Sequence, residues 1–157
     1  MIRRMNNSPD RVRAHTSPEA LQEIDRHIEE NIRYYASQDK ETISRRIEEL
    51  EREWSMERWL EMNASAIALS GLVLGLTVNK KWFMLTGAVL GFFLQHAIQG
   101  WCPPVPAFRR FGVRTRGEID REKYALKFLR GDFEGINFGD VQSNQKQVNE
   151  LLNAVYS

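Results

Sequence analysis

The sequence predicts an all-α membrane protein: a two-helix transmembrane hairpin with amphipathic helical N-terminal arms and a short helical C-terminal segment. Two observations predict this fold. No Asp, Glu, Lys or Arg occurs in residues 62–78 or 82–101, and only Asn79-Lys80-Lys81 separates the two stretches. Tryptophans also stand at the ends of these stretches, where amphipathic aromatic rings are enriched in membrane helices.

The two uncharged stretches have the lengths that membrane-spanning helices need. A hydrocarbon core of about 30 Å requires about 20 helical residues at a rise of about 1.5 Å each. Residues 82–101 meet this length. Residues 62–78 reach it if the turn residues 79–81 extend into the headgroups, as long lysine side chains can do. A soluble protein with a buried hairpin is the alternative, but so short a chain could hardly cover two helices that are apolar on every side.

The residues that flank the spans predict the orientation of the hairpin. The interface anchors are expected to be Trp59 and Trp101 at one membrane surface and Trp82 at the other. Positive side chains favour the cytoplasmic side of a membrane. The turn offers only Lys80 and Lys81, whereas arginines lie before the first span and after the second, at Arg46, Arg52, Arg58, Arg109, Arg110, Arg114 and Arg116. We therefore expect both termini in the cytoplasm and the turn outside.

Composition excludes several other classes of protein. The 22 Lys and Arg residues against 21 Asp and Glu residues leave no charge excess that would attract nucleic acid. A single cysteine excludes an intrachain disulfide and a multi-cysteine zinc site. Residues 1–10 hold arginines but no apolar run, so no cleavable signal peptide is predicted, and a mitochondrial transit sequence is the alternative for this basic segment.

Small residues suggest how the spans pack. Gly71 and Gly75 form one GxxxG pattern, and Gly87 and Gly91 form another. In lipid, such residues let helix backbones approach closely, which gains dispersion contacts. Because the turn is short, the two spans must be antiparallel neighbours. The glycines therefore predict packing within the hairpin, or a seam for self-association or for docking into a larger membrane complex.

Polar residues gather at the end of the second span. Gln95, His96 and Gln99 are expected to face protein or water rather than lipid. One interpretation is interhelical hydrogen bonding, for example to Asn63 or Ser65 at the matching depth. A more specific interpretation is that His96 binds haem iron or another metal across a symmetric oligomer.

Cys102 is the candidate thiol. It lies just past the second span, where Pro103 disfavours helical geometry. Free cysteine is usually a small buried hydrophobe. The alternatives are palmitoylation, an intermolecular disulfide or a sulfur-accepting thiol.

The remaining segments divide the chain around the hairpin. Residues 1–16 are expected to be a flexible basic tail, 17–61 cytoplasmic amphipathic helices, 62–101 the hairpin, and 102–157 a cytoplasmic loop and helical tail. One helix should begin at the Ser17-Pro18 cap, and another should run without interruption from about Lys40 to Val78. After the hairpin we expect a loop over residues 105–112, a helix from Thr115 to about Arg130, and a last helix over residues 142–156.

Residues 57–133 resemble the small two-helix membrane proteins that are related to the transmembrane half of the rhodanese-type inner-membrane protein YgaP. The resemblance is carried by Glu57-Arg58 with Asn63-Ala64, by the glycine-bearing spans and above all by Gly100-Trp101-Cys102-Pro103. The segment Ile47–Trp54 resembles helices that lead into such domains. This YgaP-like resemblance implies a bacterial inner (plasma) membrane hairpin with cytoplasmic termini that tends to dimerise. It implies no sulfurtransferase activity, because the rhodanese domain is absent.

The sequence therefore favours a non-enzymatic inner-membrane protein whose partners are the lipid bilayer and either copies of itself or other membrane-protein subunits. No Gly-rich phosphate loop, paired buried carboxylates or nucleophile–base arrangement is visible, and neither a cofactor nor a metal is predicted. Two rival hypotheses are a membrane thiol protein that acts through Cys102 and a haem or metal protein that uses His96.

Overall fold

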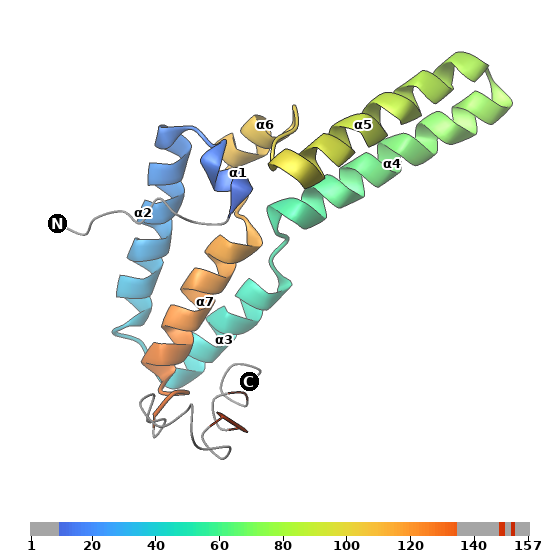
Figure 1. Ribbon diagram of the computed structural model, residues 1–157. Coiled ribbons are helices and arrows are strands. Elements are labelled where there is room, and N and C mark those ends of the chain that lie inside the picture. The colour runs from blue at the N-terminus through green and yellow to red at the C-terminus, as the bar shows by residue number, and fades with distance from the viewer. Residues whose placement is uncertain (1–9, 135–147, 150–151, 153–157) are drawn as a thin grey trace. The chain divides into compact units, whose positions relative to one another are not determined.

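The computed structural model describes residues 10–134, 148, 149 and 152, and every regular element in that part of the chain is helical (Figure 1). The predicted all-α fold is confirmed for these residues. The last predicted helix, over residues 142–156, falls almost entirely outside them. The elements are α1 (Arg11–Ala14), α2 (Pro18–Tyr35), α3 (Lys40–Arg52), α4 (Met56–Thr77), the 3-10 turn η1 (Lys80–Trp82), α5 (Phe83–Gln99), α6 (Val105–Arg110) and α7 (Arg116–Arg130).

The chain divides into two compact units, each built from segments that are distant in sequence. The first, called the hairpin unit here, comprises Met1–Asp25 and Trp54–Gly117. The second, called the bundle unit, comprises Arg26–Glu53 and Glu118–Ser157. Helix α2 begins in the hairpin unit and ends in the bundle unit.

In the hairpin unit, α4 and α5 pack antiparallel and are joined by η1 (Figure 1). The side chain of Asn79 accepts a hydrogen bond from the backbone N–H of Lys81 and so closes the turn. Between the helices, the Thr86 hydroxyl donates to the backbone carbonyl of Ala68 over 3.1 Å. The predicted tight turn and the predicted antiparallel pairing are both observed.

The helix predicted to run unbroken into the first span is interrupted, so that prediction is wrong. Helix α3 ends at Arg52, and α4 begins at Met56 after extended backbone at Glu53 and Ser55. The backbone N–H of Met56 donates to the carbonyl of Arg114 over 2.8 Å, and the Met56 side chain is fully buried. A contact with a segment 58 residues further along the chain outweighs the local helical preference, which no Pro or Gly opposes.

The segment predicted as a flexible tail is partly folded. Asp10 caps α1 by accepting hydrogen bonds from the backbone N–H groups of Val12 and Arg13. Val12 is buried in the core of the hairpin unit, and Arg11 donates to two backbone carbonyls near the end of α5. The prediction fails for residues 10–16, because their docking sites lie about 90 residues away in sequence.

The predicted loop at residues 105–112 instead contains α6. Its Val105 and Arg109 side chains are buried, and Phe108 packs against Trp59 with ring centroids 6.2 Å apart. Gly112, at φ 79°, ends the helix. The core of the hairpin unit collects residues from α1, α4, α6 and the segment between α5 and α6: Val12, Met56, Leu60, Cys102 and Val105, with Phe108 and Val113 packed against them.

The bundle unit is built from the later turns of α2 together with α3 and α7. The side chain of Asp39 caps α3, and Gly131, at φ 94°, ends α7 as predicted. Ile43, Ile47 and Leu50 lie at helical spacing on one face of α3 and are buried in the core of the unit. The buried cluster contains Ile43, Ile47, Leu50, Ile119 and Leu126, with Tyr35 packed against it.

Candidate functional site: the apolar hairpin and its base

The outer surface of the α4–α5 hairpin is apolar. Helix α5 has no buried residue, and its Met84 side chain is 77 % exposed. On α4, Leu76 is 73 % exposed. Both helices therefore direct large apolar side chains away from the protein, at Met62, Ile67, Leu69, Leu72, Val73, Leu76, Val78, Phe83, Met84, Leu90, Phe92, Leu94 and Ile98.

One helical run in the described part of the chain is long and apolar enough to cross a membrane. This run spans residues 40–77 and includes the break at residues 53–55; its apolar part is α4, and only 17 % of its most apolar stretch is buried. A core helix of a soluble protein would be mostly buried. Helix α5 has 17 residues, which is at the lower limit of the length that a membrane span needs. That either helix crosses a membrane therefore stays a prediction.

The four glycines of the hairpin fall into two classes. A Cβ added to Gly71 would lie 2.6 Å from the Thr86 hydroxyl, and one added to Gly75 would lie 2.8 Å from the Phe83 ring. These two glycines allow the helices to approach closely. Gly87 and Gly91 have no atom within 4 Å of such a Cβ, so they face outward on α5. Both pairs form the same GxxxG pattern in the sequence. Only the structure shows that Gly71 and Gly75 face the neighbouring helix, whereas Gly87 and Gly91 face outward.

The three tryptophans predicted as interface anchors lie at the two ends of the hairpin. Trp59 is in the second turn of α4 and Trp101 follows α5, so both mark the base of the hairpin, whereas Trp82 is in the turn at the opposite end. Trp59 and Trp82 are 36 % and 41 % exposed. At the base, Trp59 also contacts Trp54, whose ring lies 4.5 Å from the Arg58 guanidinium.

The predicted polar cluster at the end of α5 does not bond across to α4 through Asn63. The Asn63 amide donates instead to the carbonyl of Trp59 on its own helix. Gln95 and Gln99 contact one another at 3.5 Å, a long hydrogen bond. His96 lies apart from this pair and lines a cavity at the base of the hairpin.

That cavity has a volume of about 540 Å³ and mixed charge. Its charged lining residues are Asp10, Arg11, Glu57 and Glu61, together with His96, whose Nδ1 atom is buried without a hydrogen-bond partner. No local sequence signal pointed to Arg11, which lies 86 and 87 residues before the carbonyls that it contacts. Among the described residues, no three His, Cys, Asp or Glu side chains stand close enough together to hold a metal ion.

Cys102 is a member of the core rather than an accessible thiol. Its side chain is 4 % exposed and lines an apolar groove of about 210 Å³ between α4 and α5. Burial raises the pKa of the Cys102 thiol, although a hydrogen bond from the backbone of Val105 acts in the opposite direction. Reactive cysteines need a lowered pKa and access to their partner, so this geometry disfavours the thiol hypothesis.

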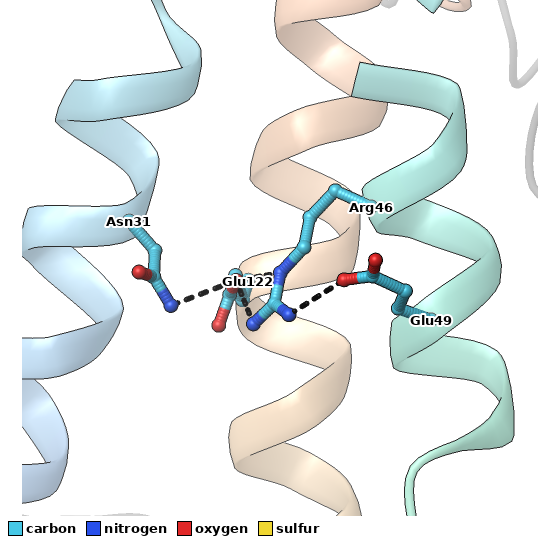
Figure 2. A network of polar contacts seen from close by, with 4 residues as sticks. All are labelled: Asn31, Arg46, Glu49 and Glu122. Atoms are coloured by element: carbon cyan, nitrogen blue, oxygen red, sulfur yellow. Dashed lines mark hydrogen bonds and ion pairs between the residues drawn. The ribbon is translucent and has the colours of Figure 1, made fainter. Parts of the chain in front are cut away.

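The bundle unit contains a buried polar network that sequence reasoning missed (Figure 2). Glu122 of α7 is fully buried and accepts hydrogen bonds from the Nε and Nη2 atoms of Arg46, both at 3.0 Å. The Asn31 amide donates to the same carboxylate oxygen, and Arg46 also pairs with Glu49. The network thus joins α2, α3 and α7. A possible sequence signal was the placement of Glu118 and Glu122 among the apolar residues of α7.

Charge and burial act against each other at Arg46. Burial alone would lower the pKa of the guanidinium, but the Glu122 carboxylate and the hydrogen bonds to Glu49 and Glu122 raise it above its ordinary value. The Arg46 guanidinium therefore stays charged in a site where an isolated charge is unfavourable. The network joins three helices, which is a structural role in the bundle unit.

Comparisons of this chain with models of protein families, with curated proteins and with solved structures give no match.

Proposed function

We propose that this protein is a non-enzymatic membrane anchor, in which the α4–α5 hairpin crosses a bacterial inner membrane and holds the rest of the chain at the cytoplasmic surface. The outward-facing apolar side chains of the hairpin carry the proposal. Burying one such side chain gains about 1.5–3 kcal/mol, so an aqueous hairpin of this composition would be strongly driven to associate or aggregate. Insertion into lipid would bury these side chains without any protein partner.

The ends of the hairpin support the proposed orientation. Lys80 and Lys81 are the charged residues of the turn, whereas arginines are concentrated around the base. This asymmetry favours a cytoplasmic base by the positive-inside rule. The resemblance to YgaP-like membrane hairpins points in the same direction and rests on the residues quoted for it.

We also propose that the anchor assembles, either with itself or with other membrane-protein subunits. Gly71 and Gly75 are already used within the hairpin. Gly87 and Gly91 leave a flat outer strip on α5 that a second helix could approach closely.

A labelling experiment tests the topology. A single cysteine is placed at Asn79 or at Ser17 in a Cys102→Ala background, and intact cells are treated with a membrane-impermeant maleimide. We expect Asn79→Cys to react from outside and Ser17→Cys to react only after the membrane is opened. The protein should also stay in the membrane pellet after alkaline carbonate extraction. Release by carbonate would refute the anchor, and external labelling of Ser17→Cys would refute the orientation.

A further inference from the structure

The outer face of α6 is an exposed surface that neither the core nor the hairpin uses. Val105, Phe108 and Arg109 point inward or pack on neighbours, whereas Pro106, Ala107, Arg110 and Phe111 are exposed. Phe111 is 84 % exposed, the highest fraction among the large apolar side chains of the described residues. A helix with one buried face and one exposed face that carries Phe and Arg is typical of segments that lie in a membrane interface.

The backbone holds Phe111 in this exposed position. The N–H of Val113 donates to the carbonyl of Phe108 over 3.0 Å, and Gly112 adopts a left-handed conformation. This pattern is a Schellman motif, and its Phe108 and Val113 side chains both pack against the core of the hairpin unit. The buried Arg109 guanidinium also holds this turn, because it donates to the Thr16 hydroxyl and to the carbonyl of Val113. The exposure of Phe111 is therefore a feature of an ordered turn.

The position of α6 limits how far Phe111 can lie from the membrane. Val105 is packed against Met56 and Leu60 at the base of the hairpin. Phe108 packs against Trp59 with ring centroids 6.2 Å apart, and Phe111 follows Phe108 by about 4.5 Å of helical rise, which is less than the headgroup layer of about 6 Å on each side of a bilayer. Phe111 is thus within reach of the interface whose depth Trp59 and Trp101 mark.

We propose that α6 and Phe111 form a second, interfacial membrane contact that binds anionic phospholipid, with the Phe111 ring at the acyl boundary and Arg110 on the headgroup phosphates. This inference rests on the proposed membrane anchor. Charge complementarity selects the partner, because Arg110, the neighbour of Phe111, is an exposed cation, whereas the acidic residues of the base, Glu57 and Glu61, line the cavity beside His96. A cation near an anionic leaflet contributes enough attraction to shift a local equilibrium about fivefold.

Spin-label accessibility measures the depth of this surface in the full-length protein. The label is placed at Ala107→Cys, one turn before Phe111, in a Cys102→Ala background, and the protein is reconstituted in phosphatidylcholine vesicles with or without phosphatidylglycerol. Labels at Leu90→Cys and Ser17→Cys serve as references for hydrocarbon and water. We expect the residue 107 label to report headgroup depth and to move deeper when phosphatidylglycerol is present.

Two substitutions test the named side chains. Arg110→Gln should remove most of the response to phosphatidylglycerol, and Phe111→Ser should shift the residue 107 label towards water. Phe128→Ser, which alters a 69 % exposed phenylalanine of the bundle unit, should leave the label unchanged.

The possible failures are distinguishable. If the residue 107 label is as water-accessible as the residue 17 label while the residue 90 label lies in hydrocarbon, the interfacial contact is refuted and the anchor stands. If the depth is the same in both lipids and Arg110→Gln has no effect, anionic recognition is refuted. If the residue 90 label is also in water, the membrane anchor itself is refuted.

Discussion

Glu122 shows what a single residue contributes to the bundle unit. Its carboxylate is fully buried and still accepts three hydrogen bonds, two from Arg46 and one from Asn31 (Figure 2). A buried ion pair adds little net stability relative to an apolar pair, but the loss of one partner leaves the other charge uncompensated. Any arrangement of α2, α3 and α7 that separates these groups is therefore destabilised.

Glu122→Ala should lower the local free energy of unfolding of the bundle unit by about 3 kcal/mol, because Arg46 would keep only Glu49 as an ionic partner. Hydrogen exchange of the α7 amides in the detergent-solubilised protein measures this change. Glu122→Gln, which retains an acceptor oxygen, should lose less.

Glu30→Ala is the matched control for this prediction. Its carboxylate pairs with Arg26 at 2.8 Å, but both side chains are more than half exposed, so the expected loss is below about 0.5 kcal/mol. Equal effects of Glu122→Ala and Glu30→Ala would show that the buried network does not stabilise the unit.

At the scale of elements, helix boundaries follow local chemistry where a side chain can supply a cap. Asp39 has extended backbone and accepts hydrogen bonds from the N–H and the hydroxyl of Thr42. The break before α4 has a different origin, since Ser55 makes no side-chain capping bond there. Burial of Met56 and its backbone contact with Arg114 determine that boundary.

The Asp39 cap should make the start of α3 sensitive to acid. Hydrogen bonding from the Thr42 backbone, and secondarily from its side chain, holds the pKa of Asp39 below its ordinary value of 3.8. A carboxylate with a lowered folded-state pKa contributes stability that is fully present above pH 3.8 and is lost as the pH falls through the folded-state value. Protection of the first-turn amides of α3 should therefore decrease in that window.

Asp39→Asn separates capping from titration, because Asn caps helices about as well as Asp but does not ionise. In hydrogen exchange corrected for intrinsic rates, this variant should lose the acid-dependent decrease while remaining protected at neutral pH. An unchanged acid response in Asp39→Asn would assign the effect to another carboxylate.

At the scale of the whole molecule, the distribution of apolar surface separates the two units. The bundle unit buries its apolar helix faces in its own core, whereas the hairpin unit covers only the base of its hairpin in this way. The rest of α4 and α5 is outward-facing. A single copy of the chain therefore leaves a large apolar surface uncovered, and Gly87 and Gly91 lie within it.

Self-assembly through that strip predicts the oligomeric state and the site of contact. The detergent-extracted protein should give an intact mass that is a multiple of 18.3 kDa by native mass spectrometry. In a Cys102→Ala background, Gly91→Cys should form an oxidative crosslink between copies. Leu76→Cys, which is 73 % exposed on α4, should not. Equal crosslinking at both positions would rule out a specific seam on α5, and additional mass would identify a partner subunit instead.

The sequence by itself determined the features that depend on neighbouring residues: the helical class, the tight turn at Asn79, the start of α2 at Pro18 and the end of α7 at Gly131. Charge-free runs, capping side chains and glycine conformations act within a few residues, so their signals are local.

Only the tertiary structure decided the docking of Arg11 beside Ile98, the break before Met56, the burial of Cys102, the formation of α6 and the pairing of Arg46 with Glu122. Each of these depends on contacts between segments that are distant in sequence, or on packing against them. Their free energy exceeds local helical preferences, which are below about 1 kcal/mol per residue for most amino acids.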